Sequence, residues 1–331
     1  MPFRALLVGL GQIGCGYDAH LPFQANQPAS SSRILSHARA LVCHPDFRLV
    51  GGVDPCEAAR ERFARIYGKP AYADIKTWRY SSNGSKIDLV VVAVAPQLQP
   101  AIVAELLSAS SPRLLLLEKP VAASLNEALA LEKICAQKSG LLVAVNYIRR
   151  YLPAVQLWQK RLQAGELGAL LHGRITYGKG LLSNGSHFVN LAEAWLGPLK
   201  LLRVIDAGGA CLGFDREASV DLQSLHHGLS ILQVRSVGHA GLRAGELDLW
   251  FTCGRICWPN DGRAIAFWPR LPPVAGDSHA PLALEPEHIL TGLDSYQFMV
   301  VDSLARFLRD PTKHVLCCSL SDGIRTLATL S

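Results

Sequence analysis

The stretch ALLVGLGQIGCGYDAH, residues 5–20, decides the fold because an apolar run leads directly into three closely spaced glycines. Gly9, Gly11 and Gly14 fit the pattern G-x-G-x-x-G, in which glycines permit a tight turn, close approach of a pyrophosphate and close helix packing. Backbone N–H groups at the following helix start would face the phosphates. The pattern alone also fits a structural turn, but its place after a strand favours a dinucleotide site.

Short apolar segments alternate with helical segments in the first part of the chain. We expect strands at residues 4–8, 48–54, 87–94, 114–118 and 141–146. We expect helices at residues 34–43, 56–67, 98–109 and 124–138, the last opening with a Ser-x-x-Glu capping box. Continuous apolar strands are typical of a parallel sheet covered on both faces. The sequence therefore predicts an α/β protein whose residues 1–147 form a Rossmann doubly wound parallel sheet.

The pattern changes after residue 147, where apolar and polar positions alternate along the expected strands. These strands are at residues 170–177, 230–237 and 246–252. They predict a C-terminal α/β domain over 148–331 with a large open, mainly antiparallel sheet. Open apolar-bearing faces are often used for association, so a homodimer or homotetramer is expected. Residues 269–287 read as a long loop and 294–309 as an amphipathic helix.

Composition excludes several classes of protein. With 49% hydrophobic and 18% charged residues the chain is globular, and its net charge of +6 is interleaved with acids. The absence of a polybasic block argues against nucleic acid as a partner, while the positive balance slightly favours an anionic substrate. No stretch approaches the roughly 18 apolar residues of a membrane span.

The nine cysteines form an odd, scattered set, which favours reduced thiols and a cytoplasmic protein. Cys253 and Cys257 have a Cys-x3-Cys spacing, but no second metal-like pair accompanies them. We interpret them as packed hydrophobic residues rather than zinc ligands, and predict no metal.

Asp54, at the end of the second expected strand, sets the cofactor preference. A carboxylate there binds the adenosine ribose hydroxyls and repels a 2′-phosphate, so NAD is favoured over NADP. Asp54 lies about 40 residues beyond Gly14, whereas ~20 is usual. Residues 17–32 account for the excess as an inserted loop, which either caps the active site or decorates the surface.

Several motifs occur in an order that resembles the glucose-fructose oxidoreductase, inositol dehydrogenase and rhizopine-catabolism (Gfo/Idh/MocA) family. They are GLGQIG at 9–14, VDP at 53–55, VAVAP at 92–96, EKP at 118–120, NYIRRYLP at 146–153 and NGSHFVNLAEAWLG at 184–197. The resemblance covers nearly the whole chain. It implies an NAD-dependent dehydrogenase or reductase with substrate bound between the two domains, beside the nicotinamide.

The same resemblance assigns roles to individual residues. The cofactor would contact Gly9, Gly11, Gln12, Ile13, Gly14, Asp54, Pro96, Glu118, Lys119 and Asn146. Lys119 and His187 would be the catalytic residues. The chain departs from the family pattern at Ser183 and Asn190, where the family has acids.

Chemistry gives each candidate a functional and a structural interpretation. Lys119 would take the hydroxyl proton when a secondary alcohol is oxidised, although strand-end lysines are commonly solvated charges. His187 would move a proton or bind a substrate hydroxyl, or else serve as a buried structural histidine. Arg150, like Lys179 and Asn184, would contact the substrate, whereas surface salt bridges are the alternative for the arginine.

These expectations combine into a hydride transfer to or from a hydroxyl or keto carbon of a sugar, cyclitol or sugar derivative, including nucleotide sugars. Two alternatives remain open from the sequence. One is transient oxidation for glycoside cleavage, which occurs in part of the family. The other is an NAD-binding sensor or assembly subunit without turnover, which the residues at 183 and 190 keep under consideration.

Overall fold

A computed structural model describes residues 1–22, 33–82, 86–211, 213, 215–228, 230–239, 242, 244–260, 262–273, 275 and 278–331. The chain forms two compact units. The first comprises residues 1–151 and 294–324, and the second comprises 152–293 and 325–331. Residues 23–32 of the expected inserted loop lie outside the described residues.

The first unit is built on a six-stranded parallel sheet with the order β3-β2-β1-β4-β5-β6. Its strands are β1 (Phe3–Val8), β2 (Phe47–Val53), β3 (Ala71–Tyr72), β4 (Leu89–Val92), β5 (Leu114–Leu117) and β6 (Leu142–Val145). The four leucines of β5 are fully buried, as expected for a strand covered on both faces. This order is that of the doubly wound dinucleotide-binding fold, so the predicted Rossmann sheet is confirmed.

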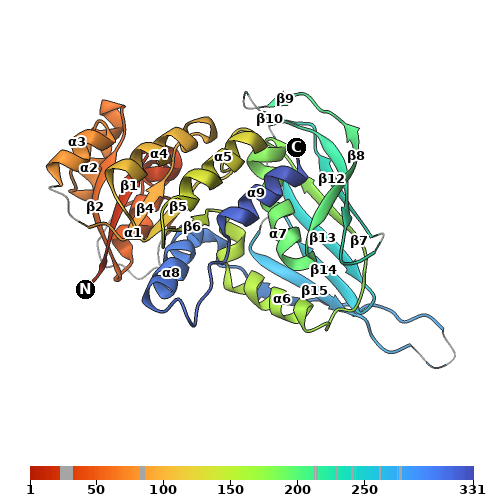
Figure 1. Ribbon diagram of the computed structural model, residues 1–331. Coiled ribbons are helices and arrows are strands. Elements are labelled where there is room, and N and C mark those ends of the chain that lie inside the picture. The colour runs from red at the N-terminus through yellow and green to blue at the C-terminus, as the bar shows by residue number, and fades with distance from the viewer. Residues whose placement is uncertain are drawn as a thin grey trace. The chain divides into compact units, whose positions relative to one another are not determined.

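Helices cover both faces of this sheet (Figure 1). They are α1 (His37–Cys43), α2 (Glu57–Tyr67), α3 (Ile75–Ser81), α4 (Gln99–Ala109), α5 (Leu125–Ala136) and α8 (Tyr296–Arg309). Helices α4 and α5 pack together on one face, and α1 packs against α8 on the other. The predicted capping box is present, because Ser124 and Glu127 bond each other's backbone N–H groups at the start of α5.

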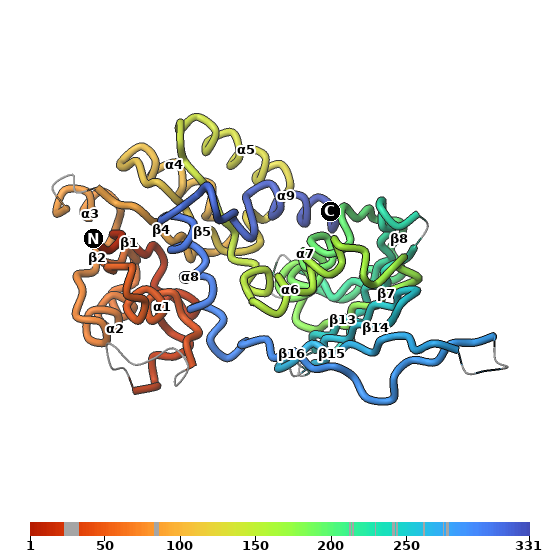
Figure 2. The backbone as a smooth tube through the Cα atoms, turned by 90° about the horizontal axis from the view of Figure 1, so that it is seen from below, coloured from red at the N-terminus to blue at the C-terminus, as the bar shows by residue number. Residues whose placement is uncertain are grey.

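Helix α8 lies beside α1 in the first unit (Figure 2), although the sequence assigned all of 148–331 to the second domain. Val300, Val301 and Leu304 form its buried stripe. An amphipathic pattern shows that a helix covers a core, but it does not show which core. The compact units therefore follow packing and not the order of the chain.

The second unit contains an eight-stranded sheet with the order β16-β15-β14-β13-β7-β12-β11-β8. Its strands are β7 (Leu170–Tyr177), β8 (Leu199–Asp206), β11 (Ser219–Ser224), β12 (Ile231–Ser236), β13 (Gly245–Phe251), β14 (Gly254–Trp258), β15 (Ala264–Pro269) and β16 (Glu287–Leu290). Strands β7 and β12 pair in parallel, and the other neighbours are antiparallel. The predicted large, mainly antiparallel sheet is confirmed.

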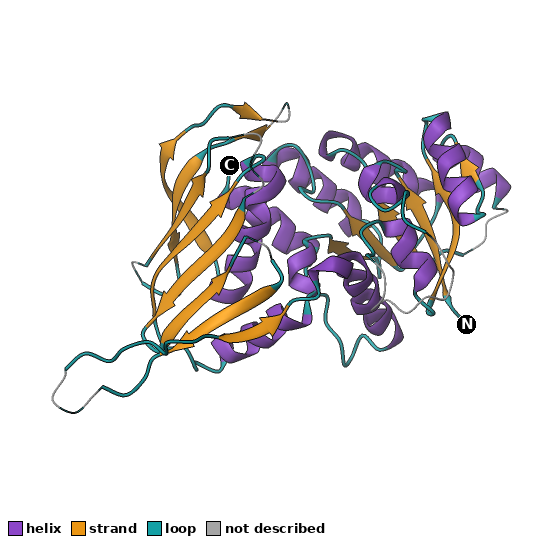
Figure 3. Ribbon diagram, turned by 180° about the vertical axis from the view of Figure 1, so that it is seen from behind, coloured by secondary structure: helices purple, strands orange, loops and turns teal. Residues whose placement is uncertain are grey.

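One face of this sheet is covered by helices α6 (Pro153–Gln163) and α7 (Ser186–Leu196), as Figure 3 shows. Leu247, Leu249 and Phe251 of β13 point to this buried face, while Trp250 lies on the opposite side. Among the described residues no helix covers that opposite face. Buried and more exposed residues therefore alternate along β13, as expected for a sheet with one open face.

Two short elements complete the second unit. A small hairpin is formed by β9 (Ala210–Cys211) and β10 (Asp215–Arg216), and the end of α9 (Leu320–Thr329) packs against α7.

The described residues include all nine cysteines, and none of them forms a disulfide. Within the described ranges, no helix is long and apolar enough to cross a membrane.

Candidate functional site

The three glycines after β1 meet three different steric demands. Gly9 has a φ of +94°, and a Cβ there would lie 2.3 Å from the Ala93 carbonyl oxygen. A Cβ at Gly14 would lie 2.1 Å from the Gly9 oxygen, whereas a Cβ at Gly11 would meet no described atom within 4 Å. A tight turn, close packing and an open approach for a diphosphate are what the fingerprint requires. This loop therefore fits a dinucleotide.

The helix after the fingerprint is short. It is η1, a single π-type turn over Gln12–Gly16, and the chain then turns through residues 17–21. Gln12 is exposed and Ile13 is half-buried at its start. Helix α1 begins only at His37, three residues later than the sequence predicted. The long helix usual after this fingerprint is thus replaced by a short turn and an inserted segment.

Asp54 lies at the end of β2 and is tied to the glycine loop. Its Oδ2 accepts the Leu10 N–H at 2.7 Å, and its Oδ1 accepts the Cys56 N–H at 2.8 Å. The Arg60 guanidinium donates to the Asp54 carbonyl oxygen at 2.9 Å. The carboxylate thereby holds a fixed position beside the fingerprint, where the ribose of a bound dinucleotide would lie.

The described ends of the inserted segment are held together by Asp18 and Arg39. The buried Asp18 carboxylate accepts the Ser36 N–H at 2.9 Å and its Oγ–H at 2.5 Å. Arg39 donates to the carbonyl oxygens of Asp18, Leu21 and Pro22 at 2.7–3.0 Å. These bonds fix where α1 begins, whatever the residues between them do.

Glu118, Lys119 and Pro120 follow β5 at the same sheet edge as the glycine loop, because both follow parallel strands. Gln99 donates from Nε2 to the carbonyl oxygens of Glu118 and Pro120, each at 2.9 Å. The Lys119–Pro120 peptide is cis. The backbone on both sides of half-buried Lys119 is therefore held by one amide.

Glu118 is a buried carboxylate directly beside Lys119. Burial alone raises the pKa of the Glu118 carboxyl, but hydrogen bonds from His37 and Asn146 hold that pKa below its usual 4.5. The group is therefore ionised at neutral pH. Sequence reasoning missed Gln99 and His37 because their partners are 19 to 81 residues away and no local pattern connects them.

The remaining candidates of the first unit lie at the ends of neighbouring strands. Pro96 follows β4 and opens η3 (Pro96–Leu98), and the buried Asn146 follows β6. Arg150 lies in η4 (Ile148–Tyr151), where its guanidinium is 3.7 Å from the Asp322 carboxylate. The ion pair expected as the alternative for this arginine is therefore present.

Lys179 and Asn184 flank a turn after β7 in the second unit. Lys179 is exposed and has a φ of +68°, a left-handed conformation uncommon for a residue with a side chain. The Asn184 Nδ2 donates to the carbonyl oxygens of Gly178 and Ala244, both at 2.8 Å. Its amide hydrogens are thus used within the protein, and only its Oδ1 remains to face a substrate.

His187 is half-buried in the first turn of α7, directly after η5 (Leu181–Gly185). The start of η5 is held by Asp215 of β10, whose carboxylate accepts the Leu182 and Ser183 N–H groups at 2.9 and 2.7 Å. An acid thus contacts position 183 although the chain has serine there. Its source, 32 residues further along, gave no signal in the sequence.

Asn190, the second departure from the family pattern, faces the interior. It is fully buried and its Nδ2 donates to the Thr326 hydroxyl at 2.9 Å. The nearby buried Glu193 accepts from Thr326 at 2.5 Å and from Thr329 at 2.8 Å. Asn190 is therefore part of the contact between α7 and the end of α9.

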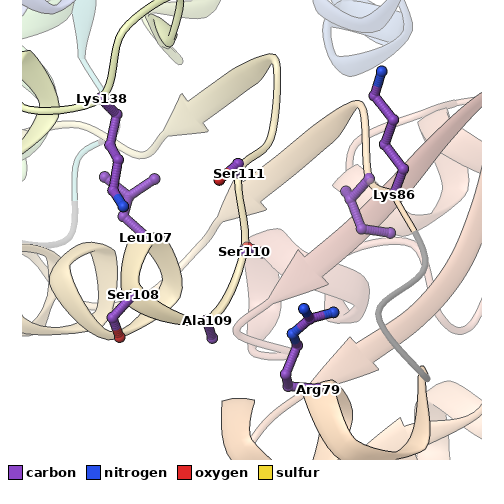
Figure 4. A pocket seen from close by; sticks show the side chains of 9 residues that line it. Arg79, Lys86, Leu107, Ser108, Ala109, Ser110, Ser111 and Lys138 are labelled. Carbon is purple, nitrogen blue, oxygen red and sulfur yellow. The ribbon is translucent and has the colours of Figure 1, made fainter.

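A pocket of about 500 Å³ opens elsewhere on the first unit (Figure 4). Its cations are Arg79, Lys86 and Lys138, and it also contains three serines. The lining residues precede strands β4 to β6, so the pocket lies at the sheet edge opposite to the glycine loop. None of the candidate residues lines it.

Comparison with known proteins gives a match for the N-terminal part of the chain. Residues 3–147 match the family model GFO_IDH_MocA, described as an oxidoreductase family with an NAD-binding Rossmann fold. Over these residues the chain is therefore similar to the Gfo/Idh/MocA family. The resemblance drawn from the motifs and the NAD cofactor are thereby confirmed. Comparison with curated proteins gave no match.

Several solved structures share the fold over nearly the whole chain. The WlbA dehydrogenase from Bordetella pertussis, in complex with NADH and UDP-GlcNAcA, is 16% identical, with a TM-score of 0.73 and coverage of 100% of this chain and 94% of its own. UDP-N-acetylglucosamine 3-dehydrogenase GnnA from Acidithiobacillus ferrooxidans is 14% identical, with a TM-score of 0.72 and coverage of 99% and 95%. An NAD binding oxidoreductase from Klebsiella pneumoniae is 15% identical, with a TM-score of 0.74 and coverage of 100% and 95%.

The candidates fall into two sets. The first unit brings together the glycine loop, Asp54, Pro96, the Glu118–Lys119 segment and Asn146 along one edge of its sheet. The second unit brings Lys179, Asn184 and His187 into one turn and the helix that follows it. In each set a buried carboxylate accepts backbone N–H groups of neighbouring residues. It is Glu118 in the first set and Asp215 in the second.

Proposed function

We propose that the protein is an NAD-dependent dehydrogenase or reductase acting on a hydroxyl or keto carbon of a sugar, cyclitol or sugar derivative. The observation that carries this proposal is the clamped Glu118–Lys119–Pro120 segment, at the same sheet edge as a glycine loop that fits a diphosphate. Asp54 favours NAD over NADP, since its carboxylate would repel a 2′-phosphate.

Bound NAD supplies the hydride acceptor, and the chain supplies the proton transfer. Lys119 takes the hydroxyl proton through Nζ as the alcohol is oxidised. His187 orients a substrate hydroxyl or moves a proton, and Arg150, Lys179 and Asn184 contact the substrate. Asn184 does so as an acceptor, because its two amide hydrogens are bonded to backbone oxygens.

We further propose a nucleotide sugar as the substrate. One similar structure is a dehydrogenase in complex with UDP-GlcNAcA, and another is named UDP-N-acetylglucosamine 3-dehydrogenase. The net charge of +6 also suits an anionic diphosphate. The left-handed Lys179 supports this class, since strained residues concentrate where ligands are held.

The test is to incubate the purified protein with NAD and a panel of UDP sugars, neutral sugars and inositols while following NADH absorbance. We expect turnover with UDP sugars, and a loss of about a hundredfold or more in Lys119→Ala, the contribution of a positioned acid–base group. Lys133→Ala is the matched control, because Lys133 is exposed on α5.

Unchanged turnover in Lys119→Ala would remove that residue from the mechanism. Binding of NADH without turnover on any member of the panel would instead favour a cofactor-binding sensor. Release of the aglycone without net NADH would indicate transient oxidation during glycoside cleavage. The three outcomes are separable with the same protein preparation.

We also propose that the open sheet face associates two or more copies of the chain in the cytoplasm. Arg255 stacks between Trp250 and Trp268, with its guanidinium carbon 5.0 and 5.1 Å from the ring centroids. Such aromatic and arginine clusters are typical of interface centres. Light scattering should give a multiple of 35.9 kDa that falls to 35.9 kDa in Trp250→Glu. A monomeric mass for the unmodified chain would refute the proposal.

A further inference from the structure

Four buried polar side chains of the first unit form a closed ring beside Lys119. Glu118 Oε1 lies 2.7 Å from His37 Nε2 and 2.6 Å from Asn146 Nδ2. Gln297, from the start of α8, closes the ring, with its Oε1 3.2 Å from Asn146 Nδ2 and its Nε2 2.8 Å from His37 Nδ1. His37 and Gln297 have no exposed surface.

The orientation of each group in the ring follows from the ionised Glu118. A carboxylate only accepts hydrogen bonds, so Asn146 must turn its Nδ2 towards it. The other Nδ2 hydrogen of Asn146 then points to Gln297 Oε1, which turns Gln297 Nε2 towards His37.

This sequence of bonds also fixes the tautomer of His37. Its Nδ1 accepts from Gln297, so the ring hydrogen lies on Nε2 and is donated to Glu118. Donors and acceptors are then matched all around the ring. A fully matched buried polar network specifies one arrangement, whereas a partly matched one is costly.

The ring is connected to Lys119 through Glu118. The second carboxylate oxygen, Oε2, accepts the backbone N–H of Lys119 at 3.3 Å. The position of that oxygen depends on His37 and Asn146, which hold the first oxygen. His37 in turn is placed by the N-cap Ser36, whose N–H and Oγ–H are bound by Asp18.

We propose that His37 and Gln297 are positioning residues that act through the Glu118 carboxylate to aim Lys119. This inference rests on the proposed function, in which Lys119 handles the substrate proton. It also gives Asp18 a role, since the bonds from Asp18 to Ser36 help to place His37 in the ring. Apolar side chains of similar volume would fill this space without the free-energy cost of burying polar groups. Stability alone therefore does not explain the ring, and a role in positioning the adjacent lysine does.

The test compares His37→Leu, which removes the donor, with His37→Gln, whose amide offers an acceptor and a donor in place of Nδ1 and Nε2. The matched control is the pair His44→Leu and His44→Gln. His44 ends the same helix, is also buried, and pairs with Asp302 of α8 at 3.4 Å. Its partner Asp302 also bonds Arg306 and is not a member of the ring.

Two readouts are measured, the first in the NADH complex and the second with NAD as the hydride acceptor. The first is the rate at which acetic anhydride acylates Lys119, followed peptide by peptide by mass spectrometry, which requires no substrate. The second is kcat with the UDP sugar that gives turnover. In His37→Leu, Glu118 loses a donor and draws the Lys119 ammonium towards it, so acylation slows by about tenfold.

We expect kcat of His37→Leu to fall by about tenfold to a hundredfold, because a small displacement of a reacting group slows the reaction by such a factor. KM and NADH affinity should stay unchanged. His37→Gln should restore both readouts, and both His44 variants should leave them unaltered. Equal acylation of Lys119 in the Leu variants at 37 and 44, or failure of His37→Gln to restore it, would overturn the inference. Should His37→Leu not fold, Gln297→Met opens the ring from the other side.

The outcomes separate the two proposals. If Lys119→Ala retains turnover, the catalytic role of Lys119 fails, while the acylation rates still decide whether His37 controls that side chain. If Lys119→Ala abolishes turnover but His37→Leu matches its His44 control, only the positioning role is lost.

Discussion

At the scale of single residues, the fingerprint shows that identical glycines serve different purposes. Gly9 provides a left-handed backbone, Gly14 avoids a collision with the Gly9 oxygen, and Gly11 borders open space. Of these three glycines, Gly11 alone would place a Cβ where no described atom lies within 4 Å. A role in binding the diphosphate explains its small size, because a side chain there would occupy the approach to the backbone.

The pair Gly11→Ala and Gly14→Ala separates these purposes. Gly14→Ala should lower the free energy of unfolding by about 1–3 kcal/mol, the usual result of forcing an atom into packed space. Gly11→Ala should leave stability unchanged and weaken NADH binding by about tenfold or more, equivalent to ~1.4 kcal/mol. Thermal unfolding and NADH fluorescence titration measure the two effects. Equal NADH affinity in Gly11→Ala and the parent would contradict the assignment.

Lys179 is a second residue whose backbone conformation asks for an explanation. A left-handed residue with a side chain costs of order 1 kcal/mol relative to glycine. Lys179→Gly should therefore not destabilise the second unit, yet it should lower kcat/KM for UDP sugars by tenfold or more if the ammonium contacts the diphosphate. Steady-state kinetics beside thermal unfolding would test this. A stable variant with unaltered kcat/KM would remove Lys179 from the substrate site.

At the scale of elements, the sequence predicts the helices and strands that depend on a local pattern of residues. It does not predict features that depend on residues far away in the chain. The buried strand β5 and the Ser124 capping box were predictable, because apolar runs and Ser-x-x-Glu act within a few residues. The start of α1 at His37 depends on Asp18, which no helix signal reveals. Similarly, the EKP motif identified Lys119 as a candidate. The polar ring beside it could not be predicted, because its members Gln297 and His37 lie 260 residues apart in the chain.

The element η5 depends on a distant acid in the same way, and this dependence can be tested. Asp215→Asn replaces a carboxylate oxygen facing the Leu182 and Ser183 N–H groups by an amide that cannot accept both bonds. The turn before His187 should loosen, lowering stability by about 1–3 kcal/mol and reducing turnover, while NADH binding stays unchanged. Asp206→Asn, at an exposed strand end, is the control. Unaltered turnover would show that His187 does not depend on this cap.

At the scale of the whole molecule, each unit contains a buried carboxylate with a lowered pKa. In the first unit it is Glu118. In the second it is Asp221 of β11, where burial raises the pKa but hydrogen bonds from Arg235 and Arg203 at 2.5 and 2.8 Å hold it below its usual 3.8. Both units should therefore lose stability in acid for the same physical reason.

The pH at which this stability is lost depends on whether the folded or the unfolded chain binds the proton first. Asp221 has a lower pKa in the folded chain than in the unfolded chain, so the unfolded chain is protonated first as the pH falls. Its stabilising effect is complete above the unfolded value of 3.8 and disappears as the pH falls through the folded value. Asp221→Asn should therefore be less stable than the parent at pH 7, with the difference shrinking below about pH 4. Urea unfolding of the second unit at pH 7 and pH 3 tests this, with Asp206→Asn as the exposed control. A difference that stays constant between the two pH values would show that the ion pairs with Arg203 and Arg235 do not lower the pKa of Asp221.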